Sequence, residues 1–226
     1  MDSTIDALFE RALTAQPSAG EDLDAEDLSA LVKLHELATE AVFERALALV
    51  ESPEWPKRLL GLRVLKEIGQ GQRPRPFNQR TMDALLPRVA SCESHVELRA
   101  LVSALGGQYD ARVLPTLLTL VDHPDADVRC HVASDLPGCA CQSDGTLDER
   151  ALSPLLQLMR DVDAEVRYYA TAAFEVDYPA MDSSVIRAAL QERLNDEDES
   201  IRLCAGRALD TRKRLSASAL HRNVAH

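Results

Sequence analysis

One short pattern recurs along the chain and limits the folds that it can adopt. An arginine that follows an apolar residue, usually with an acid before that, stands in "ELR" at Arg99, "DVR" at Arg129, "EVR" at Arg167 and "SIR" at Arg202, with a degenerate copy "WPKR" at Arg58. These anchors are 30 to 41 residues apart, a length that accommodates two amphipathic helices and two turns. The period predicts a stack of similar helical hairpins.

Each anchor lies between two helical patterns. The apolar residues upstream of Arg129 recur on one helical face, and so do those downstream; they are Val113, Leu114, Leu117, Leu118 and Val121, then Val128, Val132 and Leu136. The acidic segments "DHPDAD", "DVDAE" and "NDEDES" separate the two patterns in the last three copies. Asp and Asn side chains there are expected to cap the second helix of each hairpin.

These copies resemble the HEAT-repeat family, in which an A helix, an Asp-containing turn and a Val-Arg pair opening a B helix make one unit. The segments that carry the resemblance are "LPTLLTLVDHPDADVRCHVASDL", "LSPLLQLMRDVDAEVRYYATAAF" and "VIRAALQERLNDEDESIRLCAGRAL". The resemblance covers about residues 39–212 and implies an all-α, right-handed α-α superhelix of about five hairpins, a HEAT-repeat solenoid. It also implies that Asp122, Asp161 and Asp196 form a ladder with the anchor arginines.

The remaining segments are expected to complete a single domain over residues 1–226. Residues 1–38 contain "TIDALFERALTA" and "AEDLSALVKLHELA", which predict two helices that cap the stack, since an end unit has no neighbour on one side. Residues 213–226 form a C-terminal basic tail. The Gly/Pro/Gln-rich loop at 69–79 is interpreted as a connection within the stack.

Composition and charge narrow the classes of function. The hydrophobic fraction is 46% with only 4% aromatics, which favours a helical core of Leu, Val and Ala. The formal net charge is −12, a field that repels nucleic acid and anionic lipid and attracts basic proteins. The chain has no signal-peptide pattern, no apolar run of membrane length and five irregularly spaced cysteines. We therefore expect a cytoplasmic protein without membrane contact.

Candidate chemical sites each have a simpler interpretation. The ligand types of a zinc site occur at Cys130, His131, Cys139 and Cys141. Their spacing does not fit a common finger or ribbon. His35 and Glu36 resemble one of the four His-Glu dyads of deoxyhypusine hydroxylase, a HEAT-repeat enzyme, but an ordinary polar helix face explains them. No P-loop, nucleophile elbow or Rossmann motif is present. We predict no catalytic residue, metal, cofactor or small-molecule substrate.

The candidate binding surface is the outward face of the second helix in each hairpin. Positions opposite the buried stripe were selected by helical periodicity. Small side chains on this face allow close approach, and Tyr and Arg are frequent binding anchors. Of the adjacent Tyr168 and Tyr169, only one is expected to face outward; Tyr168 is the first choice and Tyr169 the alternative. The predicted partner-binding residues are Tyr168, Thr171, Glu175, Arg207, Ser134, Arg63 and Lys66.

The sequence thus predicts a non-catalytic protein–protein interaction scaffold with a basic protein partner. An immunity (toxin-neutralising) protein or an adaptor would suit a small acidic repeat protein. The alternative is a HEAT-like DNA glycosylase or another nucleic-acid-binding HEAT protein. That alternative needs a basic groove, and residues 91–210 carry 22 acidic and 10 basic side chains, so nucleic acid is disfavoured as a partner.

Overall fold

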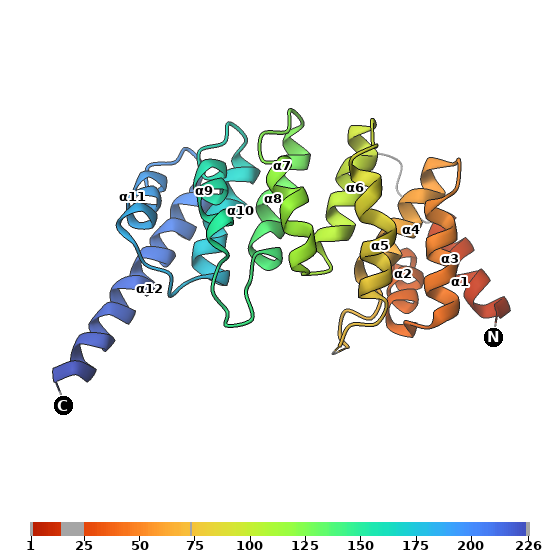
Figure 1. Ribbon diagram of the computed structural model, residues 1–226, viewed down its shortest axis with the longest axis horizontal. Coiled ribbons are helices and arrows are strands. Elements are labelled where there is room, and N and C mark those ends of the chain that lie inside the picture. Colours follow the sequence, from red (N-terminus) through yellow and green to blue (C-terminus); the bar gives the residue numbers. More distant parts are fainter. Residues whose placement is uncertain (1, 15–24, 73, 225–226) are drawn as a thin grey trace. The chain divides into compact units, whose positions relative to one another are not determined.

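The computed structural model describes residues 2–14, 25–72 and 74–224, and the regular elements within these ranges are helical (Figure 1). An isolated bridge between Cys141 and Leu147 is the one extended pairing among them. The described residues form two compact units, Met1–Gln108 and Tyr109–His226. The predicted all-α class is confirmed.

The first unit consists of three helical hairpins. Its helices are α1 (Asp2–Thr14), α2 (Ala25–Leu37), α3 (Glu40–Val50), α4 (Trp55–Glu67), α5 (Asn78–Val89) and α6 (His95–Gly106). Helix α1 packs on α2, α3 on α4 and α5 on α6, and the second helices α4 and α6 lie against each other. The two predicted N-terminal helices are thus present as α1 and α2.

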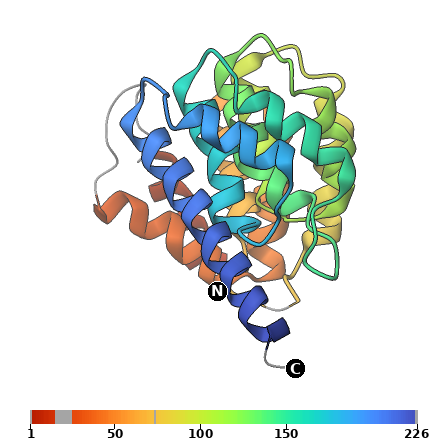
Figure 2. The same cartoon turned by 90° about the vertical axis from the view of Figure 1, so that its left-hand side faces the viewer.

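The second unit contains three further hairpins. Its helices are α7 (Leu114–Thr119), α8 (Ala126–Cys139), α9 (Glu149–Leu158), α10 (Ala164–Ala172), α11 (Ser184–Arg193) and α12 (Glu199–Val224). A 3₁₀ turn (Ala111–Val113) precedes α7, and a π-helical turn (Ala173–Asp177) ends α10. Helix α10 packs against both α8 and α12, so the second helices form one layer. The C-terminal half of α12 continues past the other helices of this unit (Figure 2).

The acidic turns start the second helices as the sequence predicted. The carboxylate of Asp125 accepts hydrogen bonds from the backbone N–H groups of Asp127 and Val128, at 2.9 and 3.3 Å. Asp163 and Asp198 cap α10 and α12 in the same way. These bonds satisfy N–H groups that lack partners within the helix.

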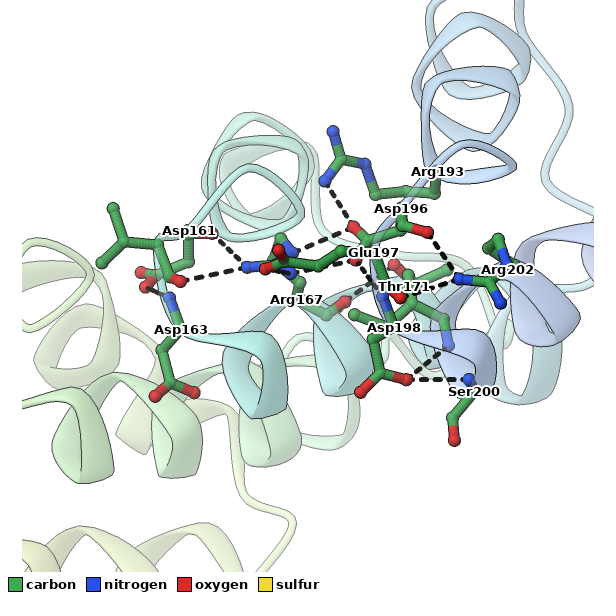
Figure 3. A network of polar contacts seen from close by, with 12 residues as sticks. Asp161, Asp163, Arg167, Thr171, Arg193, Asp196, Glu197, Asp198, Ser200 and Arg202 are labelled. Carbon is green, nitrogen blue, oxygen red and sulfur yellow. Dashed lines mark hydrogen bonds and ion pairs between the residues drawn. The ribbon is translucent and has the colours of Figure 1, made fainter.

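Arg129 and Arg167 join neighbouring hairpins of the second unit, which confirms the predicted ladder at Asp161 and Asp196. The third predicted acid, Asp122, accepts a hydrogen bond from Nε2 of Gln157, and its pairing with an anchor arginine stays a prediction. In the second unit, Nε and Nη2 of Arg129 donate to both carboxylate oxygens of Asp161, at 2.7 and 2.8 Å. Arg167 binds Asp196 in the same bidentate manner, at 3.0 and 2.9 Å (Figure 3). In each case Nη1 also donates to two carbonyls of the arginine's own turn. Each guanidinium therefore fixes one turn and attaches it to the next.

Two other arginines bind backbone carbonyls inside the units. Arg212 on α12 is 1% exposed and donates to the carbonyls of Phe174, Tyr178, Met181 and Ala208. Burial lowers the pKa of its guanidinium. In the first unit, Arg75 from the 69–79 loop donates to the carbonyls of Ile68, Lys66 and Gly107. Arg75 in the loop and Arg212 just before the predicted basic tail thus stabilise backbone carbonyls within their own units.

Gly61 sets the closest approach of α3 to α4. A Cβ at this position would lie 2.6 Å from the carbonyl oxygen of Ala46, so Gly61→Ala is expected to lower the free energy of unfolding by about 1–3 kcal/mol. Urea unfolding followed by the fluorescence of Trp55, the single tryptophan, reports on this unit. The control is Gly206→Ala on α12, where the atom nearest to the added Cβ is Leu194 Cδ2 at 3.9 Å. Unfolding followed by circular dichroism should show no loss of stability for this variant. A loss equal to that of Gly61→Ala would contradict the role given to close packing at Gly61.

Candidate functional site

Equivalent positions that are exposed or half-buried follow one another along α8, α10 and α12. They stand one and five residues after the anchor arginines Arg129, Arg167 and Arg202. We name the surface that they form with their neighbours the second-helix strip; its residues are Cys130, Ser134, Glu165, Tyr168, Tyr169, Ala172, Glu175, Leu203 and Arg207. The strip is made by the second unit alone, because its three helices pack in sequence.

Two tyrosines and nearby carboxylates form the centre of the strip. The rings of Tyr168 and Tyr169 make an edge-to-face pair with centroids 5.5 Å apart and an interplanar angle of 74°. Glu165 is exposed one turn earlier on α10. Burial, together with the charges of Glu165 and Asp135, raises the pKa of the Tyr169 hydroxyl. The same carboxylates contribute, after burial, to raising the pKa of the Cys130 thiol to about 12. The centre of the strip is therefore both aromatic and electronegative.

An ion pair between two predicted residues borders this centre. Nη2 of Arg207 donates to Oε2 of Glu175 at 3.0 Å, and Nε donates to the other carboxylate oxygen. The hydrogen bond from Arg207 holds the pKa of Glu175 below its usual value. The side chain of Arg207 is 55% exposed, and its pKa is raised by Glu175 first and, to a smaller extent, by Tyr168. The structure thus brings Tyr168, Glu175 and Arg207 together.

The other predicted residues occupy three different environments. Ser134 is exposed on α8 within the strip. Arg63 and Lys66 belong to α4 in the first unit. There Nζ of Lys66 donates to Ser103 Oγ at 2.9 Å, and burial lowers the pKa of Arg63. A binding role for each of these three residues stays a prediction.

The prediction that Thr171 binds a partner is wrong, because its side chain is buried and is not part of the surface. It is 0% exposed, and its hydroxyl donates to the carbonyl of Arg167 at 2.7 Å. The equivalent Ala133 on α8 is also 0% exposed. Helical periodicity treated the second helix as packed on one side only. In the stack, this side of α10 also faces the following hairpin, so the exposed arc is narrower than predicted.

Glu165 was missed as a member of the strip, and Tyr169 was set aside because only one of the two adjacent tyrosines was expected to face outward; both tyrosines are half-buried. Glu165 and Tyr169 lie next to Tyr168 on α10, and Glu165 precedes the tyrosines by three and four residues. Residues at this spacing share a helix face. That spacing was the available signal, and it would have added a carboxylate and a second ring to the predicted site.

The cysteines do not assemble into a site within the described ranges. Cys139 is buried and Cys141 is exposed, and no group of three or more His, Cys, Asp or Glu side chains is placed to hold a metal among the residues searched. Burial, with the charge of Asp135, raises the pKa of the Cys139 thiol to about 12. A protonated thiol is a poor nucleophile and metal ligand. Nor does any helix in the described ranges have the length and apolarity to cross a bilayer.

His35, the residue of the resembled dyad, is held neutral inside the first unit. Burial lowers its pKa to about 4, a hydrogen bond with the Arg63 backbone opposes this, and the charge of Arg75 adds to the lowering. The unfolded chain takes up a proton near pH 6.5, whereas the folded chain resists it. The contribution of neutral His35 to the free energy of unfolding is therefore complete above pH 6.5 and is lost as the pH falls toward 4.

Acid is accordingly expected to destabilise the first unit through His35. Between pH 7.5 and 5.0 the free energy of unfolding should fall by about 2 kcal/mol from this residue. Urea unfolding monitored by Trp55 fluorescence at both pH values measures the change, and His35→Gln should remove that part of the pH dependence. An unchanged pH dependence in His35→Gln would show that other groups cause it.

Stacked hairpins joined by an arginine–carboxylate ladder define an α-helical repeat protein. Residues 82–175 match the family model described as HEAT repeats. The described helices have a HEAT/armadillo-like fold, as the sequence predicted. Among curated proteins, no sequence relative matches the chain.

Solved structures with the same fold are distant in sequence. The X-ray structure of YibA from Escherichia coli is 15% identical, with a TM-score of 0.65, and the match covers 96% of this chain and 77% of that one. An archaeal HEAT-like repeats protein from Thermococcus onnurineus is 16% identical, with a TM-score of 0.54 and coverage of 92% and 79%. A designed armadillo repeat protein, solved in complex with the peptide (KR)4, is 19% identical, with a TM-score of 0.58 and coverage of 92% and 99%.

Proposed function

We propose that the chain is a non-catalytic scaffold that binds a basic segment of another protein on the second-helix strip. The observation that carries this proposal is the Tyr168–Tyr169 pair with Glu165 and Asp135 around it. An aromatic face next to carboxylates suits a Lys or Arg side chain, which gains both a cation–π contact and an ion pair.

The shape and the charge of the strip support the same class of partner. Ala172 and Ser134 are small, so a bound chain can approach the layer of helices closely. The net charge of −12 would attract a cationic segment from a distance and raise its rate of association. The designed armadillo protein of similar fold was solved with a peptide of alternating Lys and Arg, which makes such a peptide a suitable probe.

The proposal is tested by fluorescence anisotropy with a labelled (KR)4 peptide. The wild-type chain should bind it in a salt-dependent manner, and Tyr168→Ala and Glu165→Lys should each weaken binding about five- to thirtyfold. The matched control is Glu149→Lys on α9, an exposed position outside the strip. It changes the net charge by the same amount as Glu165→Lys.

The control separates a specific site from general attraction. If Glu149→Lys weakens binding as much as Glu165→Lys, the peptide responds only to net charge and the proposed site is wrong. A neutral Gly/Ser peptide should not bind to the wild-type chain. Binding of duplex DNA at physiological salt in place of the basic peptide would favour the nucleic-acid alternative.

An immunity protein and an adaptor would use the same surface in different ways. An immunity protein should form a tight one-to-one complex with one basic toxin, and that complex should dissociate more readily at high salt. An adaptor should bind a basic segment in more than one partner. Affinity capture from the native source with wild type and the Tyr168→Ala/Arg207→Ala variant, followed by mass spectrometry, distinguishes the two roles.

A further inference from the structure

Helix α12 carries a charge pattern that is antisymmetric about Gly206. Four residues to either side of this glycine lie the basic Arg202 and the acidic Asp210. Seven residues to either side lie the acidic Glu199 and the basic Lys213. At 100° per residue, all five positions fall within about 40° of one line along the helix. Two such helices packed antiparallel with their Gly206 residues in contact would therefore place opposite charges together at each level.

This face of α12 is exposed. Glu199, Asp210 and Lys213 are exposed, and Leu203 next to them is 54% exposed. A Cβ on Gly206 would find only Leu194 Cδ2 within 4 Å, at 3.9 Å. Gly206 therefore offers a flat point at which a second helix can approach closely.

The two preceding hairpins show that this side of a hairpin is normally covered. The residue eight positions before the ladder arginine is 5% exposed at Val121 and 1% exposed at Met159, but it is 41% exposed at Leu194. The residue four positions after the arginine is buried at Ala133 and Thr171, whereas its equivalent is Gly206. The last described hairpin thus presents the kind of surface that a following hairpin covers elsewhere in the unit.

Arg202 has a free hydrogen-bonding edge on the same face. Its Nη1 donates to the carbonyls of Asp196 and Glu197, at 2.7 and 2.8 Å, as in the other ladder arginines. Arg129 and Arg167 use Nε and Nη2 to bind a carboxylate of the next turn. Among the described residues, Arg202 makes no ion pair or hydrogen bond with such a carboxylate; its bonds go to the two backbone carbonyls. The guanidinium is positioned by its own turn, and the side chain is partly exposed.

We propose that this face of α12 is a self-association surface on which a second copy of the chain packs its own α12 antiparallel about Gly206. Arg202 of each copy then binds Asp210 of the other, and Glu199 of each binds Lys213 of the other. A two-fold interface of this kind contains every pair twice. A second copy is the expected partner, because an antiparallel α12 places a charge of opposite sign against each charged residue of this face.

Sedimentation equilibrium of the full chain tests the proposal. The wild type should dimerise with a dissociation constant on the order of 10–100 μM, since the interface is small. Glu199→Lys and Lys213→Glu should each weaken dimerisation about tenfold, because each places like charges opposite each other twice. The double variant Glu199→Lys/Lys213→Glu should regain wild-type affinity within about twofold, since its charges are complementary again.

Two further variants separate this contact from effects on folding. Gly206→Glu has space within its own chain but blocks the approach of a second helix, so it should be monomeric with unchanged circular dichroism. Ala188→Glu on α11 is the control, because Ala188 and its equivalent Ser153 are both exposed outside the stacking side; it should dimerise as the wild type does. A wild-type chain that stays monomeric at about 200 μM, single variants without effect, or a double variant that is not restored would each overturn the proposal.

Discussion

Replacing Arg167 with alanine is expected to lower the free energy of unfolding of the second unit by about 3–5 kcal/mol. The side chains of Arg167 and Asp196 are 7% and 2% exposed, so the substitution leaves a buried carboxylate that has lost its bidentate partner. Arg193 keeps one contact with Asp196 at 2.9 Å, which offsets part of the loss. Urea unfolding followed by hydrogen exchange on peptides from α10 and α12 measures the change.

A surface ion pair provides the control for Arg167→Ala. Arg160 binds Glu192, and these side chains are 56% and 43% exposed. Arg160→Ala should therefore cost less than about 1 kcal/mol. If the two substitutions cost the same, the ladder contact is no more than a surface ion pair, and the explanation of hairpin stacking fails.

Replacing Arg212 with methionine is expected to destabilise the second unit by roughly 3 kcal/mol or more. The guanidinium donates to four backbone carbonyls at 2.8 to 3.1 Å. Methionine fills a similar space but donates no hydrogen bond, so all four carbonyls lose the guanidinium; the carbonyl of Tyr178 keeps the bond from the Met181 N–H. Phe174 lies in the π-helical turn and Tyr178 is the residue that ends it, so faster hydrogen exchange should begin in residues 173–181.

Two variants check the explanation for Arg212. Arg214→Met removes the same charge two residues later at an exposed position and should change stability by no more than about 0.5 kcal/mol. Arg212→Lys keeps the charge but has a compact ammonium group that cannot reach four carbonyls, so it should recover less than half of the loss. Full recovery by lysine would indicate that charge, and not the planar set of donors, is what the site requires.

The hairpins and their ladder were predictable because local sequence determines them. Each turn acid caps the helix that directly follows it, as Asp163 does for α10, and each anchor arginine lies five and six residues from the carbonyls that it binds. Arg75 and Arg212 gave no such signal. Their acceptors are brought together by tertiary packing, and a basic loop or tail has the same sequence whether its arginines face solvent or backbone carbonyls.

The candidate surface was predicted only in part. Tyr168, Glu175 and Arg207 follow from the period of a single helix and lie together in the structure. Thr171 failed because its exposure depends on the neighbouring hairpin, which single-helix periodicity does not include. The importance of Glu165 and Tyr169 depends on carboxylates from two helices approaching the same ring, a relationship that only the packed structure contains.

Hydrogen exchange of the full chain with and without the (KR)4 peptide tests the central claim most directly. The peptide should slow exchange in the second helices of the second unit, above all in residues 164–172 of α10, with a smaller effect in α8 and α12. No such protection is expected in the Glu165→Lys variant at the same peptide concentration. Protection confined to the first unit, or equal protection in Glu165→Lys, would contradict a basic-segment site on the second-helix strip.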